Sequence, residues 1–573
     1  MRRWPPMPGP LSIQRLKRHL NTSNLFIAVC LLLLFLFCVY PFAVLGMKSF
    51  LSGANGSFNT AAWQKLTQSS SSLTALINTL SISAAVGILG LLIATPVAWL
   101  LARTDIPCSN KLKTLFSLPF AIPPYIGAIA WIILANPSTG ILNTFLPESL
   151  KINIYSSFGL IWVMSSFLYT FALLLILSSL NRMDASLEEA ARISGASPLQ
   201  VFFKITLPLI FPSIMGGFFL IFLAAAASFG VPAMIGNPAR IYLLTTKIYT
   251  LQKMGSMSGI YQAGMLAFLL LAIAAIGLIV NQKLMNKRDY QIVSGKSSRP
   301  SLIDLGTWRW PIFSCLITLL VIIFFLPISG IMLSAFSKLQ GKIQLDNFTF
   351  DNINRLIFET HETPRAFFNS LRLGALAATV ATALGVLFSF IRWKTKIYGR
   401  KWIEIFASLP YSAPGTVVAL AVILAFSGNF LGIFPSLYNT LSIIALAYVI
   451  KFLCFAIRTT GDAFCQIDDC LAEASRVSGA TWLQTLQKIW LPLLKPALFA
   501  AWILIFMPSF SELTMTILLS GPGIETIGTL LFQMQEYSDA SGGGSAVLCL
   551  LVIIFVFISN SLIKTISKGK YGL

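Results

Sequence analysis

The sequence has few charged residues for its length. Only 11% of its 573 residues are Asp, Glu, Lys or Arg, whereas soluble domains carry about a quarter. Histidine occurs twice and cysteine eight times, with no Cys-x-x-Cys pair. These shortages exclude a soluble enzyme of ordinary surface composition and a disulfide scaffold, and they argue against metal or redox chemistry by cysteine.

Apolar residues take the place of the missing charges. Hydrophobic residues make up 56% of the chain, and the mean hydropathy is +0.79. They occur in runs of about 20 residues, the length that an α-helix needs to cross a bilayer, whereas a transmembrane β-barrel would show alternating segments of about 10. We therefore predict an all-α polytopic membrane protein with about twelve transmembrane helices. The predicted spans are 26–47, 78–102, 114–135, 158–180, 212–235, 262–281, 312–334, 369–391, 403–426, 440–457, 494–519 and 545–563.

The basic residues predict the orientation, because Lys and Arg are retained on the cytoplasmic side. With the N-terminus inside, 29 basic residues fall on inside segments and 11 on outside segments, when Arg372 and Lys495 at the edges of their spans are counted with the adjoining segments; Lys451 lies deeper within a span. We therefore expect both termini to be cytoplasmic. This topology accounts for most of the net charge of +21, so we expect the lipid bilayer, and no nucleic acid, as a partner.

The chain divides into two halves. Residues 1–25 form a basic cytoplasmic segment, and the apolar run of about 22 residues that follows predicts a retained first helix rather than a cleaved signal peptide. Residues 286–310 are polar and basic, which predicts a cytoplasmic linker. The first transmembrane domain is then expected over 26–285 and the second over 311–573.

Each half contains a copy of one motif. Asp184–Pro212 (loop 1) aligns without a gap with Asp468–Pro496 (loop 2) at an offset of 284, and 16 of 29 positions are identical. Leu118–Pro123 likewise matches Leu409–Pro414. With six spans in each half, this duplication predicts two parallel six-helix repeats related by an axis along the membrane normal.

Each loop copy predicts two short helices around a glycine. Ser186 followed by Glu189 is a capping-box pattern that opens the first helix. Gly195 stands where that helix ends, a position that often requires a positive φ. Ser197 with Gln200 is a second capping-box pattern, and it recurs 284 residues later. We expect each copy to form a rigid helix–turn–helix across the cytoplasmic mouth.

The spacing E-A-A-x3-G-x9-I-x-L-P resembles the EAA loop of binding-protein-dependent ABC importer permeases. The resemblance covers both halves, and it implies that each loop docks on a cytoplasmic ABC ATPase subunit, two in all. The glutamates would contact the ATPase, the glycines would form the turn, and the Leu-Pro pairs would join the loop to the next membrane helix. Ser475 departs from the usual second alanine. The residues so assigned to ATPase coupling are Glu189, Ala190, Ala191, Gly195, Ile205, Leu207, Pro208, Glu473, Ala474, Ser475, Gly479, Ile489, Leu491 and Pro492.

Three other stretches resemble the fused ferric-iron-type permeases of this family, namely Ser228–Gly236, Arg240–Tyr249 and Ser511–Gly523. Fused permeases for thiamine, polyamines or phosphonates share parts of this pattern, so these substrates stay open. The resemblance implies a permease in the bacterial inner membrane that translocates a solute, with ferric iron expected, from an extracytoplasmic solute-binding protein.

The chain itself predicts no enzymatic activity. A P-loop requires G-x4-G-K-[ST], and the nearest string, Ser294–Ser297, has Tyr290 in place of the first glycine. ATP hydrolysis is therefore expected in a separate subunit, with no catalytic residue, cofactor or metal site here. A major-facilitator transporter is the alternative, but Arg103–Pro107 lacks the basic motif expected between its second and third helices. A membrane enzyme would need clustered His, Asp, Glu or Cys, which the sequence does not offer.

Glu512 is an acidic residue that lies well inside a predicted span, 494–519. An intramembrane carboxylate is costly and usually faces a cavity or a partner, so we expect Glu512 on the substrate path or at the gate. The alternative is a hydrogen bond within the helix bundle. The charged outer loop around His361 and Glu362 either contacts the binding protein or is simply solvated.

Overall fold

The computed structural model describes residues 22–52, 57–58, 63–64, 68–184, 186–286, 302–342, 344–395, 397, 399–428, 436–536 and 543–566. Most of the predicted N-terminal segment 1–25 and of the predicted linker 286–310 lies outside these ranges. Within them the chain is almost wholly helical, and the two-residue strands β1 (Leu51–Ser52) and β2 (Ser57–Phe58) pair antiparallel.

The predicted spans correspond one for one to hydrophobic helices or helix pairs. Among the described residues, nine helices are long and apolar enough to cross a membrane, and three bent pairs bring the number to as many as twelve. This confirms the all-α polytopic prediction. The nine are α5 (Ser70–Arg103), α8 (Ser157–Arg182), α10 to α11 (Pro198–Ala227), α13 (Met257–Asn286), η6 to α15 (Gly306–Ala335), α17 (Glu362–Lys394), α20 (Leu441–Gln466), η10 to α23 (Leu486–Phe510) and α26 (Gly543–Ile566).

The third span of each half is sharply bent. α6 (Ser109–Ser117) with η1 (Leu118–Ala121) meets α7 (Pro124–Ala135) at 96°, and α18 (Trp402–Ser412) meets α19 (Gly415–Phe426) at 108°. The spans predicted over 114–135 and 403–426 are therefore each formed by two helices that meet at an angle. The breaks fall at Pro123 and Pro414, because proline disfavours helical backbone at the residue before it and lacks an N–H donor. A milder bend of 40° separates α2 (Thr22–Cys38) from α3 (Tyr40–Ser49).

A π-helical turn precedes each Leu-Pro pair of the two loops. The turns are η4 (Phe202–Thr206) and η10 (Leu486–Trp490), at the same offset of 284. In each, the N–H of the leucine before the proline donates to the carbonyl five residues earlier. Since a proline ring clashes with the carbonyl of residue i−4 in an α-helix, the wider turn lets the helix continue through it.

These turns correct one expectation about the loops. The second helices, α10 (Pro198–Val201) and α22 (Trp482–Thr485), are not separate short helices. α10 runs through η4 into α11 (Leu207–Ala227), and α22 runs through η10 into α23 (Leu491–Phe510). The second helix of each loop is thus the beginning of the fifth span in its half.

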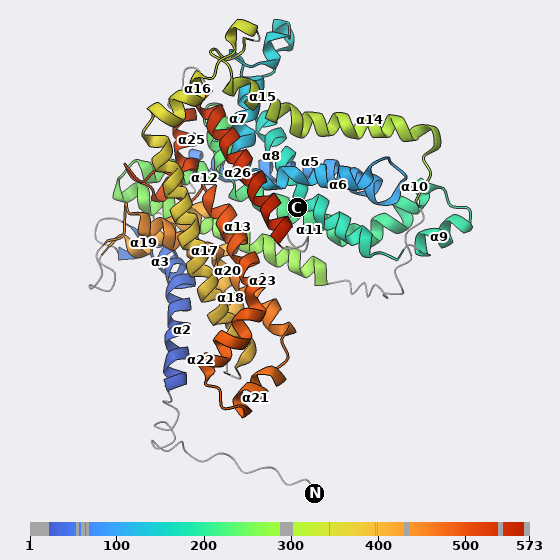
Figure 1. Ribbon diagram of the computed structural model, residues 1–573. Helices are drawn as coiled ribbons and strands as arrows, with labels where there is room; N and C mark the ends of the chain where they lie inside the picture. Colours follow the sequence, from blue (N-terminus) through green and yellow to red (C-terminus); the bar gives the residue numbers. More distant parts are fainter. Residues whose placement is uncertain are drawn as a thin grey trace. The chain divides into compact units, whose positions relative to one another are not determined.

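The chain forms two compact units. In the larger unit (residues 44–377, 412–448 and 506–573), α5, α8 and α11 pack together, and α15 (Leu326–Ala335) packs against α7 and α26. Figure 1 shows α9 (Ser186–Ile193) and α10 at one end of this three-helix bundle. In the smaller unit, buried side chains of α20 and of loop 2 itself form a core of Phe464, Ala472, Trp490 and Leu494. The predicted domains 26–285 and 311–573 stay a prediction.

Candidate functional site

Loop 1 has the turn that its glycine predicts. The N–H of Ser186 donates to Asp184 Oδ1 (3.0 Å) as α9 begins. α9 ends where Gly195 adopts φ +87°, and the N–H of Ala196 donates to the carbonyl of Ala191 (3.0 Å). Because L-residues with side chains are strained at such a φ, the glycine is required by the turn itself.

Loop 2 repeats this geometry in the smaller unit. The N–H of Cys470 donates to Asp468 Oδ1 (3.1 Å) at the start of α21 (Cys470–Val477). Gly479 adopts φ +79°, and the N–H of Ala480 donates to the carbonyl of Ser475 (3.1 Å). The two turns are therefore the same structure, as the duplicated motif predicts.

Reciprocal capping boxes open the second helix of each loop. In loop 1 the N–H of Ser197 donates to Gln200 Oε1 (2.9 Å), and the N–H of Gln200 donates to Ser197 Oγ (3.3 Å). In loop 2 the corresponding distances between Thr481 and Gln484 are 2.8 and 3.4 Å. These bonds satisfy amides that a helix start leaves unpaired and hold α10 and α22 at fixed angles to the turn.

The departure at Ser475 has a structural partner. Its hydroxyl lies 2.8 Å from Thr485 Oγ1, which joins α21 to α22. The matching positions in loop 1 are Ala191 and Val201. Two apolar residues in one loop thus correspond to a hydroxyl pair in the other, and loop 2 keeps the helix–turn–helix.

Both loops expose apolar side chains beside a glutamate. Ile193 is 88% exposed and its counterpart Val477 is 89% exposed, although both are large and hydrophobic. Glu473 is exposed and Glu189 is half-buried. Contiguous exposed apolar surface marks sites of interaction. We call these surfaces the coupling faces, formed in loop 1 by Leu187, Glu189, Ala190 and Ile193 and in loop 2 by Leu471, Glu473, Ala474 and Val477.

The remaining predicted coupling residues lie where loop and membrane helix join. The apolar members of this set are half-buried, whereas the two prolines are exposed. The two isoleucines lie in the π-helical turns η4 and η10. The two Leu-Pro pairs are the first two residues of α11 and α23. These residues are Ile205, Leu207 and Pro208 in the first half, and Ile489, Leu491 and Pro492 in the second.

A buried ion pair beside the coupling face of loop 1 was not predicted from the sequence. Glu188, next to Glu189, is 3% exposed and pairs with Arg103 at the end of α5. The motif comparison passes over Glu188 because loop 2 has Ala472 at that position. The sequence contains one signal for this ion pair: a basic residue ends the second span of each half, at Arg103 and Lys394, and each pairs with a carboxylate of its loop.

Glu512 lies in a turn, whereas the predicted span 494–519 places it within a helix. α23 ends at Phe510, and Glu512 precedes the short helix α24 (Thr516–Leu519). Its half-buried carboxylate accepts the N–H of Met515 (2.8 Å), the N–H of Thr516 (3.1 Å) and the hydroxyl of Thr516 (3.1 Å). These hydrogen bonds lie within the turn itself, and the place of Glu512 on the substrate path stays a prediction.

Oxygen atoms gather around this turn. The hydroxyl of buried Tyr448 lies 2.5 Å from Thr516 Oγ1, and the hydroxyl of buried Tyr125 donates to the carbonyl of Ser511 (3.2 Å). A methyl group at Gly230 would lie 2.5 Å from the Cβ of Tyr125 and 3.1 Å from Leu513. The non-helical segments that follow the fifth span of each half thus pack around Tyr125. We call this region the junction; it comprises Tyr125, Gly230, Tyr448, Glu512, Leu513 and Thr516.

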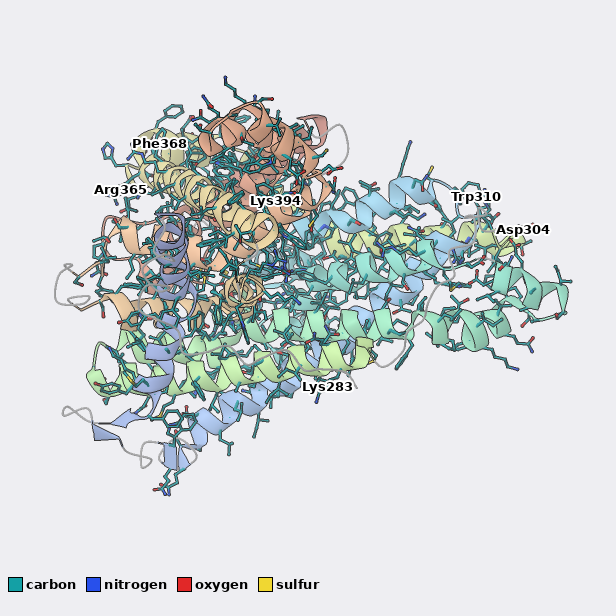
Figure 2. All side chains as sticks on the ribbon, turned by 90° about the horizontal axis from the view of Figure 1, so that it is seen from below. Lys283, Asp304, Trp310, Arg365, Phe368 and Lys394 are labelled. Carbon is teal, nitrogen blue, oxygen red and sulfur yellow. The ribbon has the colours of Figure 1, made fainter. Side chains whose placement is uncertain are left out.

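Glu525, which the predicted topology places in an outer loop, is paired with Arg365. Its Oε2 lies 3.0 Å from Arg365 Nη2, and its carbonyl accepts from Asn369 Nδ2 (2.9 Å). Figure 2 labels Arg365 close to Phe368, both on α17. In the described part of the chain, no three His, Cys, Asp or Glu side chains lie close enough together to hold a metal ion. The contacts therefore indicate a fixed loop at this end of α17.

Sequence comparison identifies each half separately. The profile of the family described as "Binding-protein-dependent transport system inner membrane component" matches residues 90–283 and 381–570. A ferric transport system permease protein of Actinobacillus pleuropneumoniae is 24% identical over 92% of this chain and 76% of its own length. An Fe(3+)-transport system permease protein of Haemophilus influenzae is 24% identical over 85% and 89%, respectively.

Other relatives carry different names. A putative 2-aminoethylphosphonate transport system permease protein of Salmonella paratyphi A is 25% identical over 41% of this chain and 86% of its own length. A solved bacterial ABC transporter involved in the import of alginate is 20% identical, with a TM-score of 0.37 over 45% of this chain and 96% of that one. Because the family profile matches both halves and more than half of all residues, the chain belongs to the binding-protein-dependent transport system inner membrane components.

Proposed function

We propose that this permease imports ferric iron delivered by an extracytoplasmic binding protein, driven by one cytoplasmic ATPase subunit under each coupling face. The observation that carries the proposal is the repeated loop geometry. Two turns with a glycine at positive φ, equivalent capping boxes and an exposed apolar residue near a glutamate occur 284 residues apart. A platform of this kind suits a pair of similar ATPase subunits.

The continuity of the helices supplies a route for coupling. In each half, the helix that follows the turn is the cytoplasmic end of the fifth span, and that span ends at the junction. A loop displaced by ATP-driven closure of the ATPases would move the whole fifth span as one rod, because its backbone hydrogen bonds continue through the π-helical turn. The junction would then open and close with the ATPase cycle.

The chemistry of the junction agrees with a hard cation as substrate. Fe³⁺ prefers oxygen ligands, and the junction brings together the carboxylate of Glu512 and the hydroxyls of Tyr448 and Thr516. Two of the relatives described above are named as ferric permeases. A phosphonate is the other candidate, favoured by the relative of that name.

Uptake by a deletion strain, with and without the restored gene, tests the substrate. We expect ferric iron accumulation to depend on the permease, and accumulation of 2-aminoethylphosphonate to be independent of it. A cytoplasmic ATPase should co-purify with the permease in the same membranes. The opposite pattern of uptake would assign the phosphonate instead, and the absence of any ATPase would contradict the coupling faces.

The proposed place of the chain is the bacterial inner membrane, with both termini in the cytoplasm. Reporter fusions at Arg192, Ser298 and Arg476 are expected to read cytoplasmic, and fusions at Asn347 and Asp539 extracytoplasmic. We expect this because basic residues are retained on the cytoplasmic side, and 29 of them fall on predicted inside segments against 11 on predicted outside segments. Paired reporters that are active on opposite sides provide the measurement. An extracytoplasmic result at either loop would contradict the mechanism, since ATP is available only inside.

A further inference from the structure

Arg103 connects four elements at the cytoplasmic end of the larger unit. It is the last residue of α5 and is 1% exposed. Its Nε lies 2.8 Å from Glu188 Oε2 on α9, and its Nη2 donates to the carbonyl of Leu180 on α8 (2.8 Å). Thr206, in the π-helical turn, donates its hydroxyl to the other oxygen of Glu188 (2.5 Å). Loop 1 is therefore bound to two membrane helices and to the base of the fifth span.

The second half fastens its loop differently. Lys394, the last residue of α17, stands where Arg103 stands in the first half. Its Nζ lies 2.5 Å from Asp469 Oδ1 and 2.8 Å from the carbonyl of Ile467. The side chains of this pair are 11% and 74% exposed, against 1% and 4% for Arg103 and Glu188. Position 472, which matches Glu188, is alanine.

The described end of the predicted linker pairs with the chain that follows α5, beside the residue that binds loop 1. The N–H of Ile303 donates to the carbonyl of Arg103 (2.9 Å), and the N–H of Asp105 donates to the carbonyl of Ile303 (3.2 Å). Asp105 also accepts the N–H of Leu305 (3.1 Å) and lies 3.5 Å from Arg309. Figure 2 labels Asp304 and Trp310 at the same end of the unit at which Figure 1 places α9.

These contacts make the two loops mechanically unequal. Removing one partner of a buried ion pair leaves an uncompensated charge away from water, so such a pair resists opening. An exposed pair is screened by salt and contributes little. We propose that Arg103 and Glu188 are positioning residues that lock loop 1 to the first half, so that ATPase motion enters through one stiff loop and one compliant loop. The proposal rests on the function proposed above for the coupling faces.

An exchange between the halves tests the lock. The triple variant Arg103→Lys, Ala185→Asp, Glu188→Ala gives loop 1 the residues that hold loop 2, namely Lys394, Asp469 and Ala472. Because the chain already uses this arrangement, we expect the variant to fold and to retain the ATPase. Ferric iron uptake at matched permease level should fall at least fivefold, with more ATP hydrolysed per ion. The matched control, Lys394→Gln, should change uptake less than twofold.

Hydrogen exchange in the purified full-length permease gives a readout that needs neither iron nor ATPase. In the parent, amides of residues 186–196 should exchange at least tenfold more slowly than those of 470–480, and the triple variant should remove this difference. Thr206→Val, which removes one hydroxyl without changing the side-chain volume much, should speed exchange in loop 1, and Thr206→Ser should restore the parent rate. Higher salt should speed exchange in loop 2 more than in loop 1.

Two results would overturn the lock. One is equal exchange of the two loops in the parent, and the other is unchanged exchange and uptake in the triple variant. Failure of the proposed function is recognised separately. In that case the parent would bind no ATPase or transport no iron, whereas the exchange difference between the loops would persist.

Discussion

Uptake is expected to be lost when Glu189 and Glu473 are both replaced by lysine, although the permease still reaches the membrane. The two carboxylates lie on the coupling faces beside Ile193 and Val477. If the ATPase surface that receives each glutamate is complementary in charge, it would then meet a lysine, and like charges in a protein interface cost several kcal/mol. The measurements are ferric iron uptake, membrane level of the permease and co-purification of the ATPase.

The matched control for this charge reversal is Glu148→Lys. Glu148 is an exposed carboxylate in a predicted outer loop, where its side chain is 93% exposed and contacts only Lys151 in a surface ion pair. Its reversal should leave uptake and ATPase binding near the parent level, because exposed pairs contribute little. Each single reversal, at Glu189 or Glu473, should reduce uptake less than the double. Normal uptake with retained ATPase in the double variant would refute the assignment of both loops.

Transport is expected to fall at least tenfold in Glu512→Gln, with the ATPase still bound. A tenfold change corresponds to about 1.4 kcal/mol in a barrier. The amide oxygen of glutamine can still accept an N–H from Met515 or Thr516, so the turn keeps most of its hydrogen bonds while its charge is removed. If the carboxylate attracts a cation at the junction, the lost charge decides the rate. Glu512→Asp should therefore retain more activity than Glu512→Gln.

Thr516→Val separates the charge of Glu512 from its hydrogen bonds. This variant keeps the carboxylate but removes the hydroxyl that contacts both Glu512 and Tyr448. We expect a smaller loss than in Glu512→Gln, measured as uptake in membranes matched for permease level. If Glu512→Gln transports like the parent, or if Thr516→Val is the more damaging change, the carboxylate serves the turn and not the substrate path.

The sequence predicts local features of this protein well. The apolar runs locate all the candidate spans, because crossing a bilayer requires a continuous apolar stretch of defined length. The glycine turns and the capping boxes of both loops are also predicted, since each depends on residues only a few positions apart. Family resemblance then assigns Glu189 and Glu473 to ATPase coupling, and this assignment stays a prediction; Glu473 is exposed and Glu189 is half-buried.

The breaks in the helices were predicted less well. Pro123 and Pro414 are visible in the sequence, yet an apolar run of the same length fits either a straight helix or a pair bent by 96° or 108°. The choice depends on neighbouring helices that satisfy the freed backbone groups. For the same reason the helical span around Glu512 was predicted too long, since hydropathy continues past Phe510 while the helix does not.

By itself, the sequence determined the number and order of the apolar segments, the duplication, the turn chemistry of the loops and the family. Tertiary structure alone decided which charges are buried and what they hold. Arg103 and Glu188 lie far apart in the sequence and meet only because α5, α8 and α11 pack together. A pairing between distant side chains depends on how helices pack, and neither composition nor spacing encodes that locally. The two related loops are held by different ion pairs, and this difference is therefore a property of the folded chain.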